Sequence, residues 1–137
     1  MSTYLSGGLT LLLLAALLGF SVQVVGIYHT TRAVDAAIVF AEMEMGLQGC
    51  VSSRAVALLR DRVKREGLNP DRLTLNYNIG PKQQRAFWGS QVDLVVTYSE
   101  PRELLSNLTA KPFNLVVDRH IATISGWVGQ QNEDLCP

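Results

Sequence analysis

The sequence predicts an α+β fold: a long N-terminal helix, one short helix and a small antiparallel sheet of about three strands. Two features predict it. The chain opens with 22 residues that carry no charged side chain, Gly7–Tyr28, and the helical pattern continues without a proline to about residue 48. Three later stretches alternate apolar and polar residues, as half-buried strands do. We therefore divide the chain into a long hydrophobic-to-amphipathic helix, residues 1–48, and a small α+β globular domain, residues 49–137.

The uncharged segment, Gly7–Tyr28, is long enough to cross a membrane. At 1.5 Å per residue its 22 residues form a helix of about 33 Å. Tyr4 and Tyr28 lie near its two ends, where aromatic residues often mark the membrane–water interface. It fits a secretory signal poorly, since no Lys or Arg precedes it and no small-x-small cleavage site follows Leu18. Two interpretations remain: a membrane anchor, or a rod that packs against copies of itself. Continued to residue 48, the helix is roughly 65 Å long, more than ordinary globular helices reach.

Small residues recur along this helix at steps of three, four and seven, which keeps them roughly on one side. Such a small-residue stripe lets helix backbones approach closely where no hydrophobic drive favours association. The alternative is that Gly and Ala are simply common in membrane helices. We favour helix–helix packing because the stripe continues past the lipid boundary. The candidate assembly residues of the stripe are Gly8, Ala15, Gly19, Gly26, Thr30, Ala33, Ala37 and Ala41.

A second, shorter helix is expected within residues 52–70, after Gly46 and Gly49 have ended the first. Gly67 fits the position just past its end, with Leu68 as the hydrophobic contact that follows such a glycine. Its expected apolar face is Val51, Ala55, Leu58, Leu59 and Val63. Basic residues late in the helix suit the C-terminal end of the helix dipole. They form either a site that binds an anionic surface or, as we favour, a solvated face. These residues are Arg60, Arg62, Lys64 and Arg65.

Three strands are expected in the remaining chain. Residues 72–79 and 91–98 alternate cleanly between apolar and polar side chains. A connector with a short helical turn follows at 99–108. Residues 112–128 give the last strand, or two short ones. The apolar alternation slips within this stretch, which predicts a bulge or bend at 118–120.

The two cysteines, Cys50 and Cys136, form no CxxC motif, so a zinc ribbon or a thioredoxin-like site is not expected. Two cysteines after an apolar segment favour an exported domain with one disulfide. Such a bond would tie the tail to the end of the first helix and stabilise the fold by on the order of 4 kcal/mol. The alternative is two buried free thiols in a reducing compartment. We favour the disulfide, because an unpaired cysteine so near the C-terminus would be exposed.

No pattern of catalytic residues is visible, so we expect a protein that is not an enzyme and uses no cofactor or metal. His29 and His120 have no cysteine or carboxylate at metal-ligand spacing. Asp118 and His120 share one strand face, with Arg119 on the other, but no nucleophile accompanies them, and a solvent-facing strand is the simpler interpretation. The chain has 12 basic and 12 acidic residues, which argues against an obligate nucleic-acid partner.

Together these residues resemble the type IV pilin-like proteins, with the strongest likeness to Tad-type pseudopilins and related small membrane proteins of conjugative elements of Gram-positive bacteria. The resemblance covers Leu9 to about Trp127. It is carried by the uncharged helix running into "YHTTRAVDAAIVFAEMEMG", by "REGLNPDRLTLNYNI" and "VDLVVTY", and by the closing "KPFNLVVDRHIATISGWV". The resemblance implies a subunit or assembly factor of an extracellular filament, whose N-terminal helices leave the membrane and pack into the filament core.

The sequence departs from pilins at one position that matters for assembly. Pilins usually carry a glutamate at the fifth mature position, and here Leu5 stands there, so charge pairing between neighbouring N-termini is not expected. Ser6, Thr10 and Gln23 would offer weaker polar contacts instead. The filament core would then depend mainly on close packing of the small-residue stripe.

Two functions follow as hypotheses. The first is a structural filament subunit that rests in the cell membrane before assembly and is then extracellular, with copies of itself and the assembly machinery as partners. The second is a single-pass membrane component of a secretion or conjugation apparatus that does not polymerise.

Overall fold

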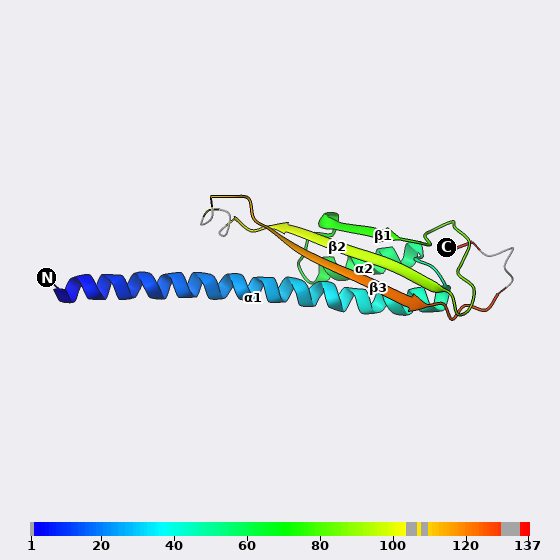
Figure 1. The fold of residues 1–137 in the computed structure, drawn as a ribbon, viewed down its shortest axis with the longest axis horizontal. Coiled ribbons are helices and arrows are strands. Elements are labelled where there is room, and N and C mark those ends of the chain that lie inside the picture. Colours follow the sequence, from blue (N-terminus) through cyan, green and yellow to red (C-terminus); the bar gives the residue numbers. More distant parts are fainter. Residues whose placement is uncertain (1, 104–106, 108–109, 130–134) are drawn as a thin grey trace. The chain divides into compact units, whose positions relative to one another are not determined.

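The computed structural model describes residues 2–103, 107, 110–129 and 135–137 of the chain. It has the predicted α+β fold (Figure 1), with a long helix, a short helix and a three-stranded antiparallel sheet. The elements in chain order are α1 (Ser2–Gln48), α2 (Ser53–Arg65), the 3₁₀ turn η1 (Pro70–Arg72), β1 (Leu73–Tyr77), β2 (Gln91–Pro101) and β3 (Asn114–Ile124).

The chain forms two compact units, Met1–Arg32 and Ala33–Pro137. The division falls inside α1, earlier than the helix end that we used to divide the sequence. The reason is packing: from Ala33 onward α1 contributes to the hydrophobic core of the second unit. The first unit consists of helix alone.

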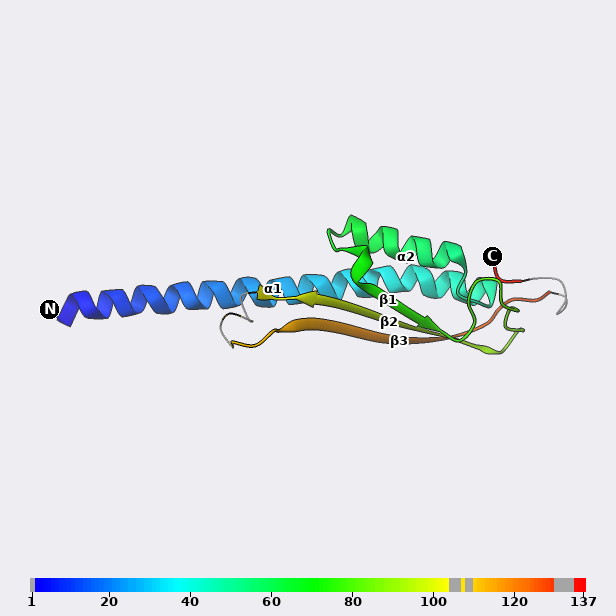
Figure 2. The same cartoon turned by 90° about the horizontal axis from the view of Figure 1, so that it is seen from above.

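The second unit has two layers. The sheet has the order β1-β2-β3, and α2 and the last turns of α1 lie together over one of its faces (Figure 2). Strand β2 supplies the centre of the core, because its alternate residues are all buried. The core side chains contributed by α1 and β2 are Val34, Ala37, Ile38, Ala41, Met45, Val92, Leu94, Val96 and Tyr98.

Helix α2 ends as its sequence predicted, and the structure adds a cap at its start. At the start, the Ser52 hydroxyl accepts a hydrogen bond from the Ala55 backbone N–H at 3.0 Å, a cap worth about 1 kcal/mol. At the end, Gly67 has a φ of 80°, and the Leu68 backbone N–H donates to the Val63 carbonyl at 3.1 Å. This is the hydrogen-bond pattern of a Schellman motif. Of the predicted apolar face, Ala55, Leu59 and Val63 are buried, whereas Leu58 is 40% exposed.

Helix α1 ends at Gln48, as the sequence predicted, two residues past Gly46. Gly46 remains helical, so the prediction that it breaks the helix was wrong. Gly49 ends it, with a φ of 68° in the left-handed region that favours glycine. A Cβ atom at Gly49 would also lie 2.6 Å from the Ala86 carbonyl oxygen. Gly46 lies against the end of the sheet, where its carbonyl accepts a hydrogen bond from the Gly126 N–H at 2.8 Å.

Strand β3 has no bulge, so the predicted irregularity at 118–120 was wrong. Every residue from Asn114 to Ile124 pairs with one residue of β2. Arg119 lies on the same face of the strand as Val117 and Ile121 and breaks the apolar pattern without changing the register. Its guanidinium reaches the carboxylate of Asp35 on α1 at 2.8 Å. Residues 104–106 and 108–109 of the predicted connector lie outside the described residues.

Candidate membrane and assembly surface

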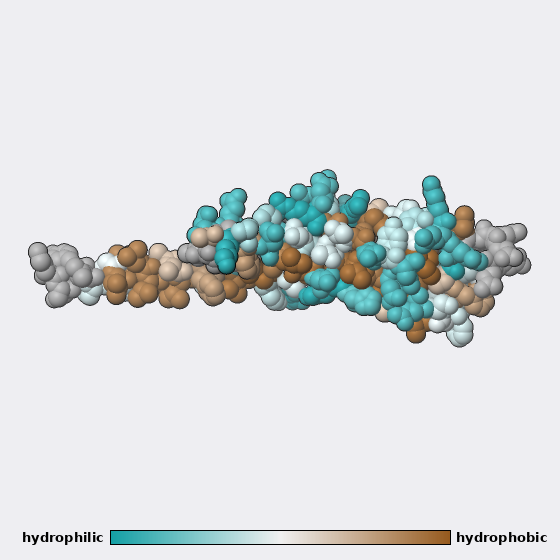
Figure 3. Space-filling view, turned by 45° about the horizontal axis from the view of Figure 1, so that its top comes forward, coloured by the Kyte–Doolittle hydropathy of each residue, from teal (hydrophilic) through white to brown (hydrophobic). Residues whose placement is uncertain are grey.

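The first unit presents a continuous apolar surface (Figure 3). Between Leu9 and Tyr28, the large hydrophobic side chains other than Ile27 are 47–71% exposed. Among the described residues, one helix is long and apolar enough to cross a membrane, from Ser6 to Gln48, with a best mean hydropathy of 2.2. Exposed leucines in this number are costly in water, at roughly 1.5–3 kcal/mol for each large side chain left uncovered. This surface therefore requires lipid or other protein around it. The exposed residues are Leu9, Leu11, Leu12, Leu13, Leu14, Leu17, Leu18, Phe20, Val22, Val24, Val25 and Tyr28.

The hydroxyl groups of the first unit are satisfied within the helix. Thr10 and Ser21 each donate to the backbone carbonyl four residues earlier, both at 2.8 Å. Thr30 and Thr31 do the same at 3.0 and 2.9 Å. Such bonds let a hydroxyl enter an apolar environment without an unpaired polar group. They make Thr10 a poor candidate for the polar contact between helices that we expected of it.

Gln23 differs from these hydroxyls. Its side-chain oxygen is shielded from solvent and has no hydrogen-bond partner among the described residues. An unpaired carboxamide oxygen in an apolar segment is unfavourable, and in membranes such groups commonly bond across a helix–helix interface. Gln23 is therefore a residue of the segment whose shielded side-chain oxygen still lacks a donor among the described residues.

The structure separates the small-residue stripe into two parts. A Cβ atom added at Gly8 or Gly19 would meet nothing within 4 Å, so the small size of these residues serves no contact within the chain. Ala15 is exposed, and Gly26 is partly exposed. Gly8, Ala15 and Gly19 therefore leave backbone open to a neighbouring helix.

The other part of the stripe packs inside the second unit. Ala33, Ala37 and Ala41 have exposures of 4%, 0% and 0%. Ala37 and Ala41 belong to the core between α1 and the sheet. The short side chains of these alanines thus serve the close approach of helix to sheet within the chain. Of the candidate assembly residues, Gly8, Ala15 and Gly19 are the ones whose exposure suits a direct contact with a second helix.

The predicted disulfide is present between Cys50 and Cys136, which are 0% and 2% exposed. Backbone hydrogen bonds hold the tail on both sides of it. The Cys136 N–H donates to the Gln83 carbonyl at 2.8 Å, and the Ser53 N–H donates to the Pro137 carbonyl at 2.8 Å. The bond joins the α1–α2 junction to the tail, as the sequence analysis expected.

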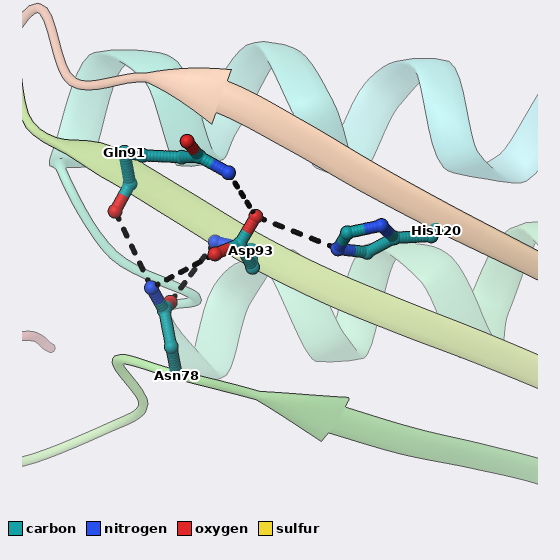
Figure 4. Close-up of polar contacts among 4 residues, drawn as sticks. All are labelled: Asn78, Gln91, Asp93 and His120. Atoms are coloured by element: carbon teal, nitrogen blue, oxygen red, sulfur yellow. Dashed lines mark hydrogen bonds and ion pairs between the residues drawn. The ribbon is translucent and has the colours of Figure 1, made fainter.

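Four polar side chains gather on the outer face of the sheet (Figure 4). The Asn78 carboxamide accepts the Asp93 backbone N–H at 2.9 Å and donates to the Gln91 carbonyl at 3.3 Å, which continues the ladder past the end of β1. The Asp93 carboxylate also accepts from the Gln91 side chain at 2.7 Å and lies 3.5 Å from His120. The group contains no Ser, Cys or Lys nucleophile. Its contacts extend strand pairing rather than assemble a reaction centre.

Asp118 and His120 are both exposed, as expected of the solvent-facing strand that the sequence favoured, and they have different partners. Asp118 accepts a hydrogen bond from the Thr97 hydroxyl at 3.0 Å, whereas His120 turns toward Asp93. Within the part of the chain that the structure describes, no three His, Cys, Asp or Glu side chains lie close enough to hold a metal ion.

Tyr98 is the one large polar side chain in the centre of the second unit's described core. Its side chain is 0% exposed. Burial, followed by the nearby charge of Glu100, raises the pKa of the Tyr98 hydroxyl from its usual 10.0.

No protein-family model matches the chain, and searches of curated proteins and of solved structures found no match. The function is therefore argued from the surface itself. The sequence analysis missed a second apolar surface, on the part of α1 that belongs to the second unit. Its exposed residues are Val39, Phe40, Met43 and Leu47. Their spacing of three and four was the available signal.

Proposed function

We propose that this protein is the structural subunit of an extracellular pilus-like filament, assembled through its hydrophobic N-terminal helix. The observation that carries the proposal is the uncharged segment, whose glycines at positions 8 and 19 have open space around them. A lone anchor has no use for exposed backbone, whereas a bundle of helices does, because close approach gains van der Waals contact.

In the proposed function the segment lies first in lipid and then in the core of a filament. In lipid, before assembly, the exposed leucines are covered by acyl chains. In a filament, where lipid is absent, the same side chains of neighbouring subunits cover one another. The polar second unit then forms the outer surface. Gln23 supports this proposal, since a neighbouring helix offers the hydrogen-bond donor that its own helix does not.

The disulfide supports the extracellular location. Disulfides persist in secreted and cell-surface proteins and are rare in the cytosol of most organisms. The bond between Cys50 and Cys136 is buried and joins residues 86 positions apart. It therefore places the second unit on the oxidising side of the membrane in this proposal.

A second function is favoured by a different observation. Helix α1 satisfies the length and composition of a membrane span, and the hydroxyls of Thr10 and Ser21 are satisfied within it. A single-pass membrane component of a secretion or conjugation apparatus needs no more than this. In that case the second unit contacts other machinery, and copies of the chain do not polymerise.

Electron microscopy of the sheared surface fraction separates the two functions. Cells that make the protein are sheared, and the released material is negatively stained and labelled with antibody against the second unit. Label along the whole length of thin filaments supports the subunit. Label confined to membrane fragments, with no filament decorated, overturns the first function in favour of the second.

A further inference from the structure

Strand β3 lies at one edge of the sheet and pairs with β2 on one side. The loops at its two ends show which of its backbone groups face β2. The Arg102 N–H donates to the Phe113 carbonyl at 2.9 Å, and the Ser125 N–H donates to the Ser90 carbonyl at 2.8 Å. In antiparallel pairs, residues that exchange hydrogen bonds alternate with residues that do not. The odd-numbered residues of β3 therefore bond to β2. The even-numbered ones direct their N–H and C=O groups away from the sheet, and they are Asn114, Val116, Asp118, His120, Ala122 and Ile124.

These outward backbone groups have one recorded partner within the described part of the chain. The Asp118 carbonyl accepts a hydrogen bond from the guanidinium of Arg119 at 3.1 Å. All six outward residues are exposed. The strand has 11 residues, so this free edge is about 37 Å long. A row of unpaired N–H and C=O groups is a template for one more strand.

A groove runs beside this edge, between β3 and α1 (Figure 1). Its volume is about 360 Å³. Ile38 of α1 and Ile121 of β3, each 8% exposed, form the apolar part of its lining. A strand added to β3 would lie about 4.8 Å further out and would direct every second side chain into the groove. The edge thus offers main-chain partners, and the groove offers room for side chains.

The charges around the groove favour a basic occupant. Asp35 and Arg119 both line it and pair with each other at 2.8 Å. Glu42, seven residues later on the same side of α1, is exposed and has no ion-pair partner among the described residues. Asp118 adds an exposed carboxylate on the edge itself. With His120 neutral, two carboxylates are left without a cation, in a chain whose net charge is zero. Such complementarity selects among partners more than it adds affinity.

We propose that the β3 edge is a peptide-docking site, where an extended segment of a partner protein, rich in lysine or arginine, adds as a fourth strand. In this mode of recognition, main-chain hydrogen bonds supply the affinity and alternate side chains supply the specificity. A cationic side chain that points into the groove meets Glu42. The inference goes beyond the proposed filament, and it holds equally for a membrane component that does not polymerise.

A second copy of the chain fits this edge less well. Antiparallel pairing of two β3 edges would turn one copy end for end, whereas copies in one membrane or one filament point the same way. Strands β1 and β3 are both antiparallel to β2, so β3 would pair with β1 of a like-oriented copy in parallel, which is less stable per residue. Strand β1 also offers only five residues to an edge of 11. The length of the edge therefore favours a separate extended segment.

Fluorescence polarisation measures the docking. The full-length protein, in micelles of an uncharged detergent, is titrated against a labelled heptapeptide that alternates lysine and valine. One control peptide has glutamate in place of lysine. A second keeps the lysines but has its three central amides N-methylated, which removes the donors of both its edges. We expect the lysine peptide to bind saturably and at least about tenfold more tightly than either control. No saturable binding, or equal binding of either control, overturns the inference.

Amide hydrogen exchange, resolved by NMR, locates the docked strand. We expect the lysine peptide to slow exchange at least about tenfold at the outward amides of Asp118, His120 and Ala122. The amides of Arg119 and Ile121 already bond to β2, so we expect no change there. Absence of this alternation overturns the inference. So does protection of the outward amides that rises with protein concentration when no peptide is present, because that result places a second copy on the edge.

Two substitutions test the backbone and the charge separately. Ala122→Pro removes one outward N–H without removing a bond to β2, and edge strands tolerate proline at such positions. We expect it to weaken binding of the lysine peptide at least about tenfold at an unchanged urea midpoint. Glu42→Gln and Glu44→Gln remove matched charges from α1, two residues apart and so on different sides of the helix. We expect only Glu42→Gln to weaken binding, by about threefold. Equal effects of the two, or normal binding by folded Ala122→Pro, contradict the site. Should Ala122→Pro not fold, the N-methylated peptide still decides.

Discussion

Gly19 and Ala37 lie on the same small-residue stripe, yet replacement by leucine has opposite consequences at the two positions. Ala37 is 0% exposed in the core between α1 and the sheet. The added methyl and methylene groups of Ala37→Leu overfill that core, at a cost of about 1–3 kcal/mol in the free energy of unfolding. A Cβ atom at Gly19 meets nothing within 4 Å, so Gly19→Leu leaves the free energy of unfolding of the second unit within about 0.5 kcal/mol of the wild type.

The assay uses the tryptophans of the protein. Trp88 and Trp127 are its two tryptophans, and both lie in the second unit, so their fluorescence reports unfolding of that unit alone. With a urea dependence of about 1–3 kcal/mol per molar, Ala37→Leu lowers the midpoint by on the order of 1 M, and Gly19→Leu leaves it in place. Filament yield shows the complementary pattern: Gly19→Leu abolishes assembly of a folded protein.

Two results would refute the reasoning. An unchanged urea midpoint for Ala37→Leu contradicts the placement of Ala37 in a filled core. Wild-type filament yield for Gly19→Leu contradicts the role of open backbone in helix packing. Ala15→Gly is a control for the second measurement, because it keeps the surface small, and we expect it to assemble.

Three further predictions concern single groups. Reducing the disulfide lowers the free energy of unfolding by roughly 4.5 kcal/mol, from a loop of 86 residues in the chain-entropy model, and urea titration with and without reductant measures it. Because the pKa of Tyr98 is raised in the folded state, the free energy of unfolding falls as pH rises above about 10. The variant Tyr98→Phe removes this fall. An equal fall in the variant would contradict a raised pKa at Tyr98. Gln23→Leu inserts into membranes normally but weakens helix association by about 0.6 kcal/mol. Energy transfer between labelled helices in vesicles measures this change. Unchanged association argues against Gln23 as an interhelical contact.

Local signals carried the sequence predictions that were right. Gly67, predicted as the residue past the end of α2, acts within a few residues, so its role is readable from the sequence alone. The alternation in β2 is equally local. The pairing of Cys50 with Cys136 rested instead on the surroundings of the two residues, and the structure confirms it.

The predictions that failed depended on contacts between residues far apart in the sequence. Arg119 looked like a break in the β3 pattern because its partner, Asp35, is 84 residues earlier in the chain. Ala37 and Gly19 look alike in sequence, and only the sheet behind Ala37 distinguishes them. The exposed apolar residues of the second half of α1, Val39, Phe40, Met43 and Leu47, could not be predicted for the same reason. Whether an apolar residue on a helix is exposed depends on which side of the helix the sheet packs against.

The disulfide also determines how the chain would bear mechanical load. A pull applied between the N-terminal helix and the tail runs along residues 1–50, crosses the sulfur–sulfur bond and leaves through Cys136 and Pro137. Residues 51–135 form a closed covalent loop off that path, so the strands carry no tension and cannot be drawn out. In a filament under shear, a subunit pulled in this direction lengthens only through residues 1–50 and 136–137 until the bond is reduced.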